Sequence, residues 1–320
     1  MSKDGKKLYT HQRFVSMTLD PVHIGTGGYR LGRVDNTIVR EPGTNLPKIP
    51  GTSLLGAARS YAAMRYGKPE AAGQHKNFKG DKNKCPIIYT FGTATEAGGG
   101  QAGKVSIGDA HILFFPVHSM AGPVWVSTKE VIECVGFGSN GVNDIGDETT
   151  LTSLTWTKDN LNLGWLLLKA KPRLKVTPPD GISSMKEWKA IASRIALVSP
   201  KLFSQIVSSN LEVRTSVAIN PETGAAEDKA LFTYEAIPRA TWLWFDVIED
   251  GYLETFRTFP VTEKQFKDGK ENNGKALGES WKCPMDVART GLRLMEFLGV
   301  GGMGTRGFGR MKPLADWEVE

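Results

Sequence analysis

A glycine-rich segment near the end of the chain, GVGGMGTRGFGRM at 299–311, combines bare backbone with arginines and has no acidic residue. Glycine lets another molecule approach the peptide closely, and Arg306 and Arg310 are suited to pairing with phosphates. The first glycines match the dinucleotide fingerprint GxGxxG, which requires a strand before it and a helix after it. Because the expected order here is the reverse, we discount that match. Two interpretations are left: a tight helix-to-strand turn, or a backbone cradle for a phosphate or nucleic-acid chain.

The sequence PGTS at 50–53 is a second candidate anion site, because it opens a helix expected from about Thr52 to Arg65. Free N–H groups and the positive end of the helix dipole would lie beside the hydroxyls of Thr52 and Ser53. Arg59 follows seven residues after Thr52 and returns to the same face. An ordinary helix cap with a solvated arginine explains these residues equally well.

Asp35 is the candidate for catalysis, in a loop close in sequence to Arg30, Arg33 and Arg40. A carboxylate among arginines is most often an ion-pair partner. It can also serve as a catalytic acid or metal ligand facing a phosphodiester. His23, the nearest histidine in the sequence, is more simply explained as a surface or hydrogen-bonded side chain.

Composition sets the outer limits. The 320 residues, 40% of them hydrophobic, suffice for a sizeable core in one large domain or two small ones. A formal net charge of +6 is compatible with a nucleic-acid partner, as it is with many ordinary enzymes. Three scattered cysteines without CxxC or HExxH motifs indicate neither disulfides nor zinc and fit a reducing cytoplasm. Without an apolar leader or a membrane-length apolar run, we expect a soluble, cytoplasmic protein with no membrane partner.

Hydrophobic periodicity predicts an uneven mixture of strands and helices. This order favours a β-α-β-β-α-β core with long insertions over a doubly wound fold. Asp109, inside an apolar run, is expected to cap a neighbouring backbone. The expected strands are 12–20, 104–117, 124–128, 211–219, 241–248 and 310–319, and the expected helices are 52–65, 185–207 and 284–298. The expected buried stripes are Leu54, Ala58, Tyr61 and Ala62 in the first helix, and Val287, Gly291, Leu294 and Leu298 in the last.

Several segments together resemble a known family. They are HIGTGG, VDNTIVRE, LPKIPGTSLLGAAR, FFPV, INPETGAAEDKALFTYEAIP and GVGGMGTRGFGRM, in that order. Over about residues 12–319 the chain resembles the RAMP superfamily of CRISPR proteins, and more narrowly the repeating backbone ribonuclease subunit of type III effector complexes. ILFFPVHS favours the Cmr (type III-B) version, whereas VDN at 34–36 suits the Csm (type III-A) version equally well.

The resemblance implies an α+β fold in a single RAMP domain over 1–320. Its centre would be a modified RRM or ferredoxin-like palm. The resemblance further implies a basic finger-like insertion at 67–104, an insertion of unknown role at 134–186 and a thumb hairpin at 211–237. Copies of the chain and other CRISPR effector subunits would assemble along a guide RNA. Each thumb would push one base pair of the guide–target duplex out of line, and the single-stranded target RNA would be cut beside it.

The resemblance also implies a site. In the family an aspartate in the loop after the first strand carries cleavage, and it matches Asp35. Asp35 would take the proton of the RNA 2′-hydroxyl, or bind a loosely held divalent cation, Mg or Mn, beside phosphate oxygens. RNA contacts would be mostly to the backbone and therefore indifferent to sequence. The expected RNA-binding residues are His23, Arg40, Lys48, Thr52, Ser53, Arg59, Phe232, Thr233, Gly301, Gly302, Met303, Thr305, Arg306 and Arg310.

One departure concerns the first helix, where Leu55 stands in place of the lysine that the family often has in the pattern SSLKG. We therefore expect some guide affinity to come from lysines of the finger-like insertion, at Lys76, Lys79, Lys82 and Lys84. Two alternative functions are a guide-RNA-binding scaffold that cuts nothing and a stand-alone endonuclease that processes the precursor of the guide. The stand-alone endonuclease would need a histidine or lysine placed for acid–base catalysis, and His23 alone is weak support for it.

Overall fold

A computed structural model of the chain describes residues 7–27, 34–73, 78, 80–93, 100–140, 145–156, 158–252, 258–261 and 281–319. Its centre is an antiparallel sheet in which β14 (Met311–Glu318) lies beside β1 (Tyr9–Thr18), and β13 (Trp242–Asp250) lies between β1 and β3 (His111–Val117). This arrangement confirms the expected β-α-β-β-α-β core. In chain order its elements are β1 (Tyr9–Thr18), α1 (Gly51–Tyr66), β2 (Val105–Ile107), β3 (His111–Val117), β13 (Trp242–Asp250), α6 (Pro284–Leu298) and β14 (Met311–Glu318).

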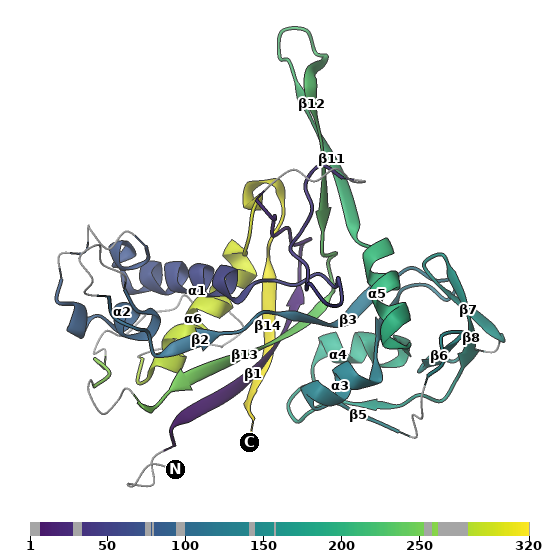
Figure 1. Cartoon of the computed structure of the whole chain (residues 1–320), viewed down its shortest axis with the longest axis horizontal. Helices are drawn as coiled ribbons and strands as arrows, with labels where there is room; N and C mark the ends of the chain where they lie inside the picture. Colours follow the sequence, from purple (N-terminus) through teal and green to yellow (C-terminus); the bar gives the residue numbers. More distant parts are fainter. Residues whose placement is uncertain are drawn as a thin grey trace.

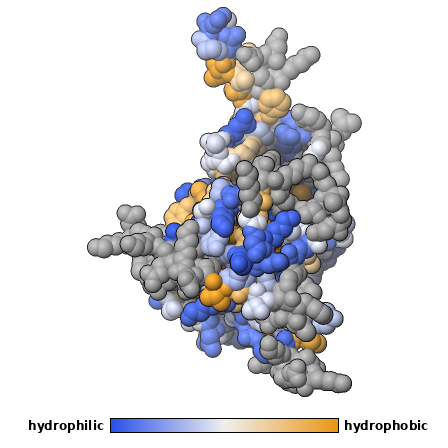
Figure 2. All heavy atoms as spheres, turned by 90° about the vertical axis from the view of Figure 1, so that its left-hand side faces the viewer, coloured by the Kyte–Doolittle hydropathy of each residue, from blue (hydrophilic) through white to orange (hydrophobic). Residues whose placement is uncertain are grey.

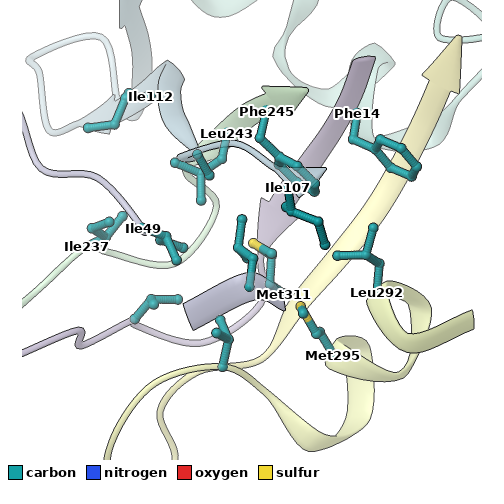
Figure 3. Close-up of a cluster of buried hydrophobic side chains, with 14 of the residues drawn as sticks. Phe14, Ile49, Ile107, Ile112, Ile237, Leu243, Phe245, Leu292, Met295 and Met311 are labelled. Atoms are coloured by element: carbon teal, nitrogen blue, oxygen red, sulfur yellow. The ribbon is translucent and has the colours of Figure 1, made fainter. Parts of the chain in front are cut away.

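The two long helices cover one face of this sheet (Figure 1). Phe14 of β1 and Phe245 of β13 stack with their ring centroids 5.4 Å apart, and the side chains of Leu292 and Met295 of α6 lie in the same cluster (Figure 3). The helices approach each other at Gly291, where an added Cβ would lie only 2.1 Å from the carbonyl oxygen of Ala58. Only a residue without a side chain permits this approach.

The predicted stripe of the last helix is partly wrong. Leu298 is 53% exposed and Leu294 is only half-buried, whereas Leu292 and Met295 are buried with Val287 and Gly291. Because Gly291 faces α1, the helix is turned so that Leu292 and Met295 reach the sheet. In α1 the stripe is confirmed except at Tyr61, which is half-buried and donates its hydroxyl to the carbonyl of Gly299 at 2.6 Å.

The segment between β3 and β13 extends the sheet and covers part of its other face. Phe114 and Trp242 of the sheet pack there against Trp188, which belongs to one of two short helices that cover this face. Among the described residues five strands continue the sheet beyond β3, and three of them lie within 134–186, the segment that showed no clear period. The described elements after β3 and up to residue 197 are β4 (Val124–Ser127), α3 (Lys129–Val135), β5 (Gly138–Ser139), β6 (Thr149–Thr152), β7 (Asn160–Leu163), β8 (Leu166–Lys171), β9 (Val176–Thr177), α4 (Lys186–Ile191) and β10 (Ile195–Leu197). β5 and β9 pair with each other, apart from the main sheet.

The prediction of one helix over 185–207 is wrong. After α4 comes a short 3₁₀ helix (Ala192–Arg194), then β10, and then α5 (Pro200–Ser209). Pro200 takes the first helical position, where its missing N–H costs nothing, and the hydroxyl of Ser199 accepts from the N–H of Leu202. The residues of β10 are buried between β4 and β6, so strand pairing prevails over the local helical pattern.

The expected flexible insertion at 67–104 is partly ordered within the core. Its described residues include two 3₁₀ helices (Pro69–Ala71 and Lys82–Lys84) and the helix α2 (Pro86–Phe91). Every residue of α2 is buried. Ile87, Ile88 and Phe91 of α2 belong to the main core, a pattern hidden by the polar sequence around the helix. Lys82 and Lys84 lie in the second 3₁₀ helix, whereas Lys76 and Lys79 fall outside the described residues.

The predicted hairpin at 211–237 is confirmed. It consists of β11 (Glu212–Ile219) paired antiparallel with β12 (Ala226–Ala236), and it projects far from the body (Figure 1). Apolar surface lies along it below a hydrophilic tip (Figure 2), and Val217 and Leu231, which pair across the strands, are 44% and 62% exposed. In the part of the chain that the structure describes, no helix is both long and apolar enough to cross a bilayer.

Candidate functional site

Three segments distant in sequence meet at the base of the hairpin, on the last residues of β12. The loop at 34–40 joins it through hydrogen bonds from the N–H of Asn36 to the carbonyl of Thr233 and from the N–H of Glu235 to the carbonyl of Asn36, both 3.0 Å. The turn after β1 joins it through Val22, which forms a bridge with Ile237. The glycine segment at 299–311 completes the site, as described below.

Asp35 is exposed at this junction and is held by Thr233. Its Oδ2 accepts from the backbone N–H of Thr233 at 2.8 Å and from the Thr233 hydroxyl at 2.7 Å. These donors, the backbone N–H first, hold the pKa of the Asp35 carboxyl below its ordinary value. Arg30 and Arg33, the other expected neighbours, lie outside the described residues.

Arg40 lies within the site as an internal ion pair. Its guanidinium is 2.6 Å from Oε1 of Glu235 and also donates to the carbonyl of Asn45 at 3.1 Å and the hydroxyl of Ser208 at 3.2 Å. The side chains of Arg40 and Glu235 are only 18% and 12% exposed. Arg40, expected to contact RNA, therefore fastens the Asp35 loop to the hairpin and to α5.

His23 is buried beside the same strand. Its Nδ1 lies 2.6 Å from the carbonyl oxygen of Glu235, and its ring meets that of Tyr234 edge-on. The hydrogen-bonded interpretation of His23 is thereby confirmed. An RNA contact through the ring would have to pass the groups that already enclose it.

The glycine segment forms a compact turn against His23 and Tyr234. The N–H of Gly302 donates to the His23 carbonyl at 3.1 Å, and Phe308 is buried edge-on against Tyr234. Between them lies a short 3₁₀ helix (Gly304–Arg306), preceded by Met303 with a φ of 63°. The turn and the cradle are thus compatible: the interior of the loop packs on the protein, while Gly301, Gly302, Gly304 and Thr305 are exposed.

The two arginines of this segment differ in their partners. Arg306 is exposed, and one of its guanidinium nitrogens lies 3.4 Å from the Tyr234 hydroxyl. Arg310 instead forms a two-point pair with Asp20, at 2.5 and 3.1 Å, which lowers the pKa of the Asp20 carboxyl. Arg306 is therefore the better placed of the two to meet a phosphate.

The start of α1 forms a separate group of residues. The N–H of Gly51 donates to Oδ1 of Asp109 at 2.7 Å, which confirms the expected capping role of Asp109. Lys48 lies between Asp109 and Glu41, at 2.7 and 2.9 Å. A carboxylate and a paired lysine thus already occupy the positive end of this helix, whose N-cap residue is Pro50, so Thr52 and Ser53 lie within the helix and are not its cap.

Arg59 does not return to that helix end. It donates to the carbonyl of Ala71 at 2.9 and 3.1 Å, and burial lowers the pKa of its guanidinium. Phe232, at 38% exposure, pairs with Ser216 on the face of the hairpin opposite to that of Thr233. The structure therefore brings His23, Asp35, Arg40, Thr233 and the glycine segment together, and leaves Lys48, Thr52, Ser53 and Arg59 apart from the hairpin base.

Several residues of the site were not singled out from the sequence. Glu235 and Tyr234 hold the two loops, Phe308 packs under the glycine segment, and the guanidinium of Arg214 lies 4.8 Å from the centre of the Phe308 ring. The alternation in FTYEA, which places Thr233 and Glu235 on the same side of a strand, was the available signal. Within the described residues, no three His, Cys, Asp or Glu side chains gather as a ready metal site.

Comparison with known proteins identifies the family. The model that describes the RAMP superfamily matches residues 17–312. The chain belongs to the RAMP superfamily. The resemblance found in the sequence is thus confirmed, and so is the α+β fold that it implied.

Individual relatives of this RAMP protein come from CRISPR complexes. The chain is 33% identical over 250 residues to the CRISPR system Cmr endoribonuclease Cmr4 of Pyrococcus furiosus, covering 72% of this chain and 78% of the relative. The crystal structure of oligomeric Cmr4 from Pyrococcus furiosus matches with a TM-score of 0.56 at 21% identity over 97% of this chain and 99% of that one. A cryo-EM structure of the type III-B Cmr-beta complex bound to cognate target RNA contains a chain that matches with a TM-score of 0.60 at 13% identity, over 96% and 98%. At these identities the two structures establish a shared fold.

Proposed function

We propose that this RAMP protein is a repeating backbone subunit of a type III CRISPR complex of the Cmr kind, which binds guide RNA and cleaves complementary target RNA at regular intervals. The observation that carries the proposal is the exposed carboxylate of Asp35, which accepts two hydrogen bonds from Thr233 at the base of a projecting hairpin. The relative named as a Cmr endoribonuclease and the neighbours named as oligomeric or bound to target RNA support it. Its partners would be guide RNA, target RNA, further copies of itself and other effector subunits.

Cleavage of RNA requires few catalytic groups from the protein. RNA carries its own nucleophile, the 2′-hydroxyl, so cleavage mainly requires the displaced nucleotide to be held with that oxygen in line with the scissile phosphate. The exposed apolar side chains of the hairpin, such as Val217 and Leu231, are suited to pressing between bases. Asp35 lies at the foot of the same hairpin, so one copy of the chain would define one cleavage position.

We expect a divalent cation at this site to be bound jointly by the protein and the RNA. Both donors from Thr233 reach Oδ2 of Asp35, which leaves its Oδ1 as a carboxylate ligand of the kind that Mg²⁺ and Mn²⁺ prefer. Phosphate oxygens and water would complete the coordination, because the described residues gather no three ligands. The cation would supply charge neutralisation at the phosphate. We expect EDTA to stop cleavage and added Mg²⁺ or Mn²⁺ to restore it.

The decisive experiment is Asp35→Asn in chain assembled with guide RNA and offered labelled target RNA. An asparagine oxygen still accepts from Thr233, so the loop keeps its position while the charge is lost. We expect cleavage to fall by about 10²–10⁴-fold, with assembly and target affinity unchanged. Asp147→Asn is the control, since Asp147 is likewise exposed and accepts from a serine hydroxyl at 2.6 Å.

Undiminished cleavage by Asp35→Asn would remove Asp35 from the reaction. Absence of cleavage by the unaltered complex would favour the scaffold that cuts nothing. Cutting of precursor guide RNA by the isolated chain would favour the stand-alone endonuclease, although His23, its candidate base, is buried and bonded to Glu235.

A further inference from the structure

Asp35 and Thr233 are joined by three hydrogen bonds. Two run from Thr233 to Oδ2 of Asp35, from the backbone N–H at 2.8 Å and from the hydroxyl at 2.7 Å. The third runs from the backbone N–H of Asp35 to the same hydroxyl at 3.0 Å. The hydroxyl thus uses its one proton on the carboxylate and a lone pair on the loop backbone. Among the described residues, no residue other than Asp35 itself donates a hydrogen bond to Oδ1.

We propose that Thr233 is a positioning residue for Asp35, and that its hydroxyl fixes the carboxylate with Oδ1 open to the RNA. The proposal rests on the function proposed above for Asp35. It reassigns Thr233, which the sequence placed among the RNA contacts, from binding RNA to orienting the group that acts on RNA.

The physical need for such a residue follows from exposure. An exposed aspartate on a loop samples several rotamers, and catalysis requires one of them. Thr233 belongs to β12, which pairs with β11 through most of its length, so it offers the loop a fixed reference. The same strand holds the loop through Asn36 and Arg40, but only Thr233 contacts the carboxylate among the described residues.

The arrangement also couples base displacement by the hairpin to cleavage at Asp35. The hairpin that would displace a base carries Thr233 at its foot, so a shift of the hairpin moves the Asp35 carboxylate with it. Because Thr233 stabilises the charged form, Asp35 is suited to remain ionised and to orient groups or hold a cation, and less suited to take up a proton.

The test replaces only the hydroxyl. Thr233→Val keeps the branched shape, Thr233→Ser keeps the hydroxyl, and Thr215→Val makes the same change on the residue paired directly across the hairpin from Thr233. Each full-length variant is assembled with guide RNA, and single-turnover cleavage of target RNA is measured from acid to neutral pH beside target affinity.

We expect Thr233→Val to cleave about 10–100-fold more slowly, with unchanged target affinity and the acid limb of its rate–pH profile displaced to higher pH. Thr233→Ser should retain most of the rate, and Thr215→Val all of it. Two outcomes would overturn the inference: a Thr233→Val rate and profile equal to those of Thr215→Val, or a loss confined to target affinity, which would make Thr233 an RNA contact.

A second measurement separates this inference from the proposed function because it needs no activity. The carboxyl carbon of Asp35, assigned in the ¹³C NMR spectrum of the full chain by its absence in Asp35→Asn, reports the pKa of Asp35 directly. We expect Thr233→Val to raise that pKa towards its ordinary value and Thr215→Val to leave it unchanged. An unchanged pKa in Thr233→Val would show that the hydroxyl does not hold the carboxylate, whatever the complex cleaves.

Discussion

The backbone of Gly301 lies directly against the carbonyl group of His23. A Cβ at Gly301 would lie 2.6 Å from the His23 oxygen, and φ at Gly301 is +87°, a conformation that other residues rarely adopt. Gly304, in the same segment, has no heavy atom within 4 Å of the position of its missing Cβ. The packing of the chain therefore requires a glycine at position 301, whereas the described residues leave room for a side chain at position 304.

Alanine at these two positions should have opposite effects. Gly301→Ala combines a clash with a strained backbone and should lower the free energy of unfolding by about 1–3 kcal/mol. Gly304→Ala should leave stability within about 0.5 kcal/mol of the unaltered chain and weaken guide-RNA binding, because the added methyl blocks close approach to the backbone. Urea unfolding and filter binding at fixed salt measure the two effects. If Gly304→Ala binds RNA normally, the exposed half of the segment is only a turn.

The closest approach of the two long helices gives a second prediction. Gly291→Ala would place a methyl carbon 2.1 Å from the carbonyl oxygen of Ala58, so α1 and α6 would have to separate. We expect a loss of about 1–3 kcal/mol or more in the free energy of unfolding. Gly56→Ala, in α1 where no atom lies within 4 Å, is the control and should stabilise by up to about 1 kcal/mol through helix propensity. Equal stability of the two variants would contradict the packing described here.

Elements whose own sequence decides their structure were predictable. The alternation of β1 and β11, the apolar run of β13, and the helical periods and end signals of α1 and α6 are local patterns that burial reinforces. The residues of β10 show the opposite case. They follow a helix in sequence, and only their place between β4 and β6 makes them a strand.

The site divides in the same way. Asp35 and the glycine segment could be found from the sequence because they lie in the segments that resemble the RAMP superfamily, whose model matches residues 17–312. Their supports could not, because Thr233 stands 198 residues from Asp35 in the sequence and Glu235 stands 195 residues from Arg40. The expected phosphate sites at Arg59 and Lys48 were isolated side chains in the sequence, whereas the fold gives each a partner within the protein.

The pair of Arg40 and Glu235 tests which role Arg40 has. Removing the guanidinium leaves the Glu235 carboxylate largely buried without its partner, so Arg40→Ala should lower the free energy of unfolding by about 2–4 kcal/mol. Lys201→Ala, which breaks an exposed pair with Asp147, should cost less than about 1 kcal/mol. An Arg40→Ala chain that unfolds like the unaltered one but binds guide RNA poorly would restore the sequence-based assignment of Arg40 to RNA.

Asp246 on β13 should make stability depend on acid pH. Its carboxylate accepts two hydrogen bonds from Arg13, at 2.8 and 2.9 Å, and lies 3.0 Å from Nε2 of His11. Burial alone would raise the pKa of Asp246, but the bonds from Arg13 and His11 outweigh it and the pKa is lowered. A lowered pKa in the folded state means that the unfolded chain binds more protons, so stability falls as the pH falls.

The contribution of Asp246 is therefore complete above the unfolded pKa of about 3.9 and is lost as the pH drops through the lower folded value. We expect Asp246→Asn to be less stable than the unaltered chain at pH 7, and the difference to shrink below about pH 4, as measured by urea unfolding across this range. Glu318→Gln, in the exposed pair with Lys7, should leave the pH dependence unchanged. If the free energies of unfolding of Asp246→Asn and the unaltered chain differ by the same amount at every pH, the lost stability comes from packing. A loss that comes from the charge of the carboxylate must instead vary with pH.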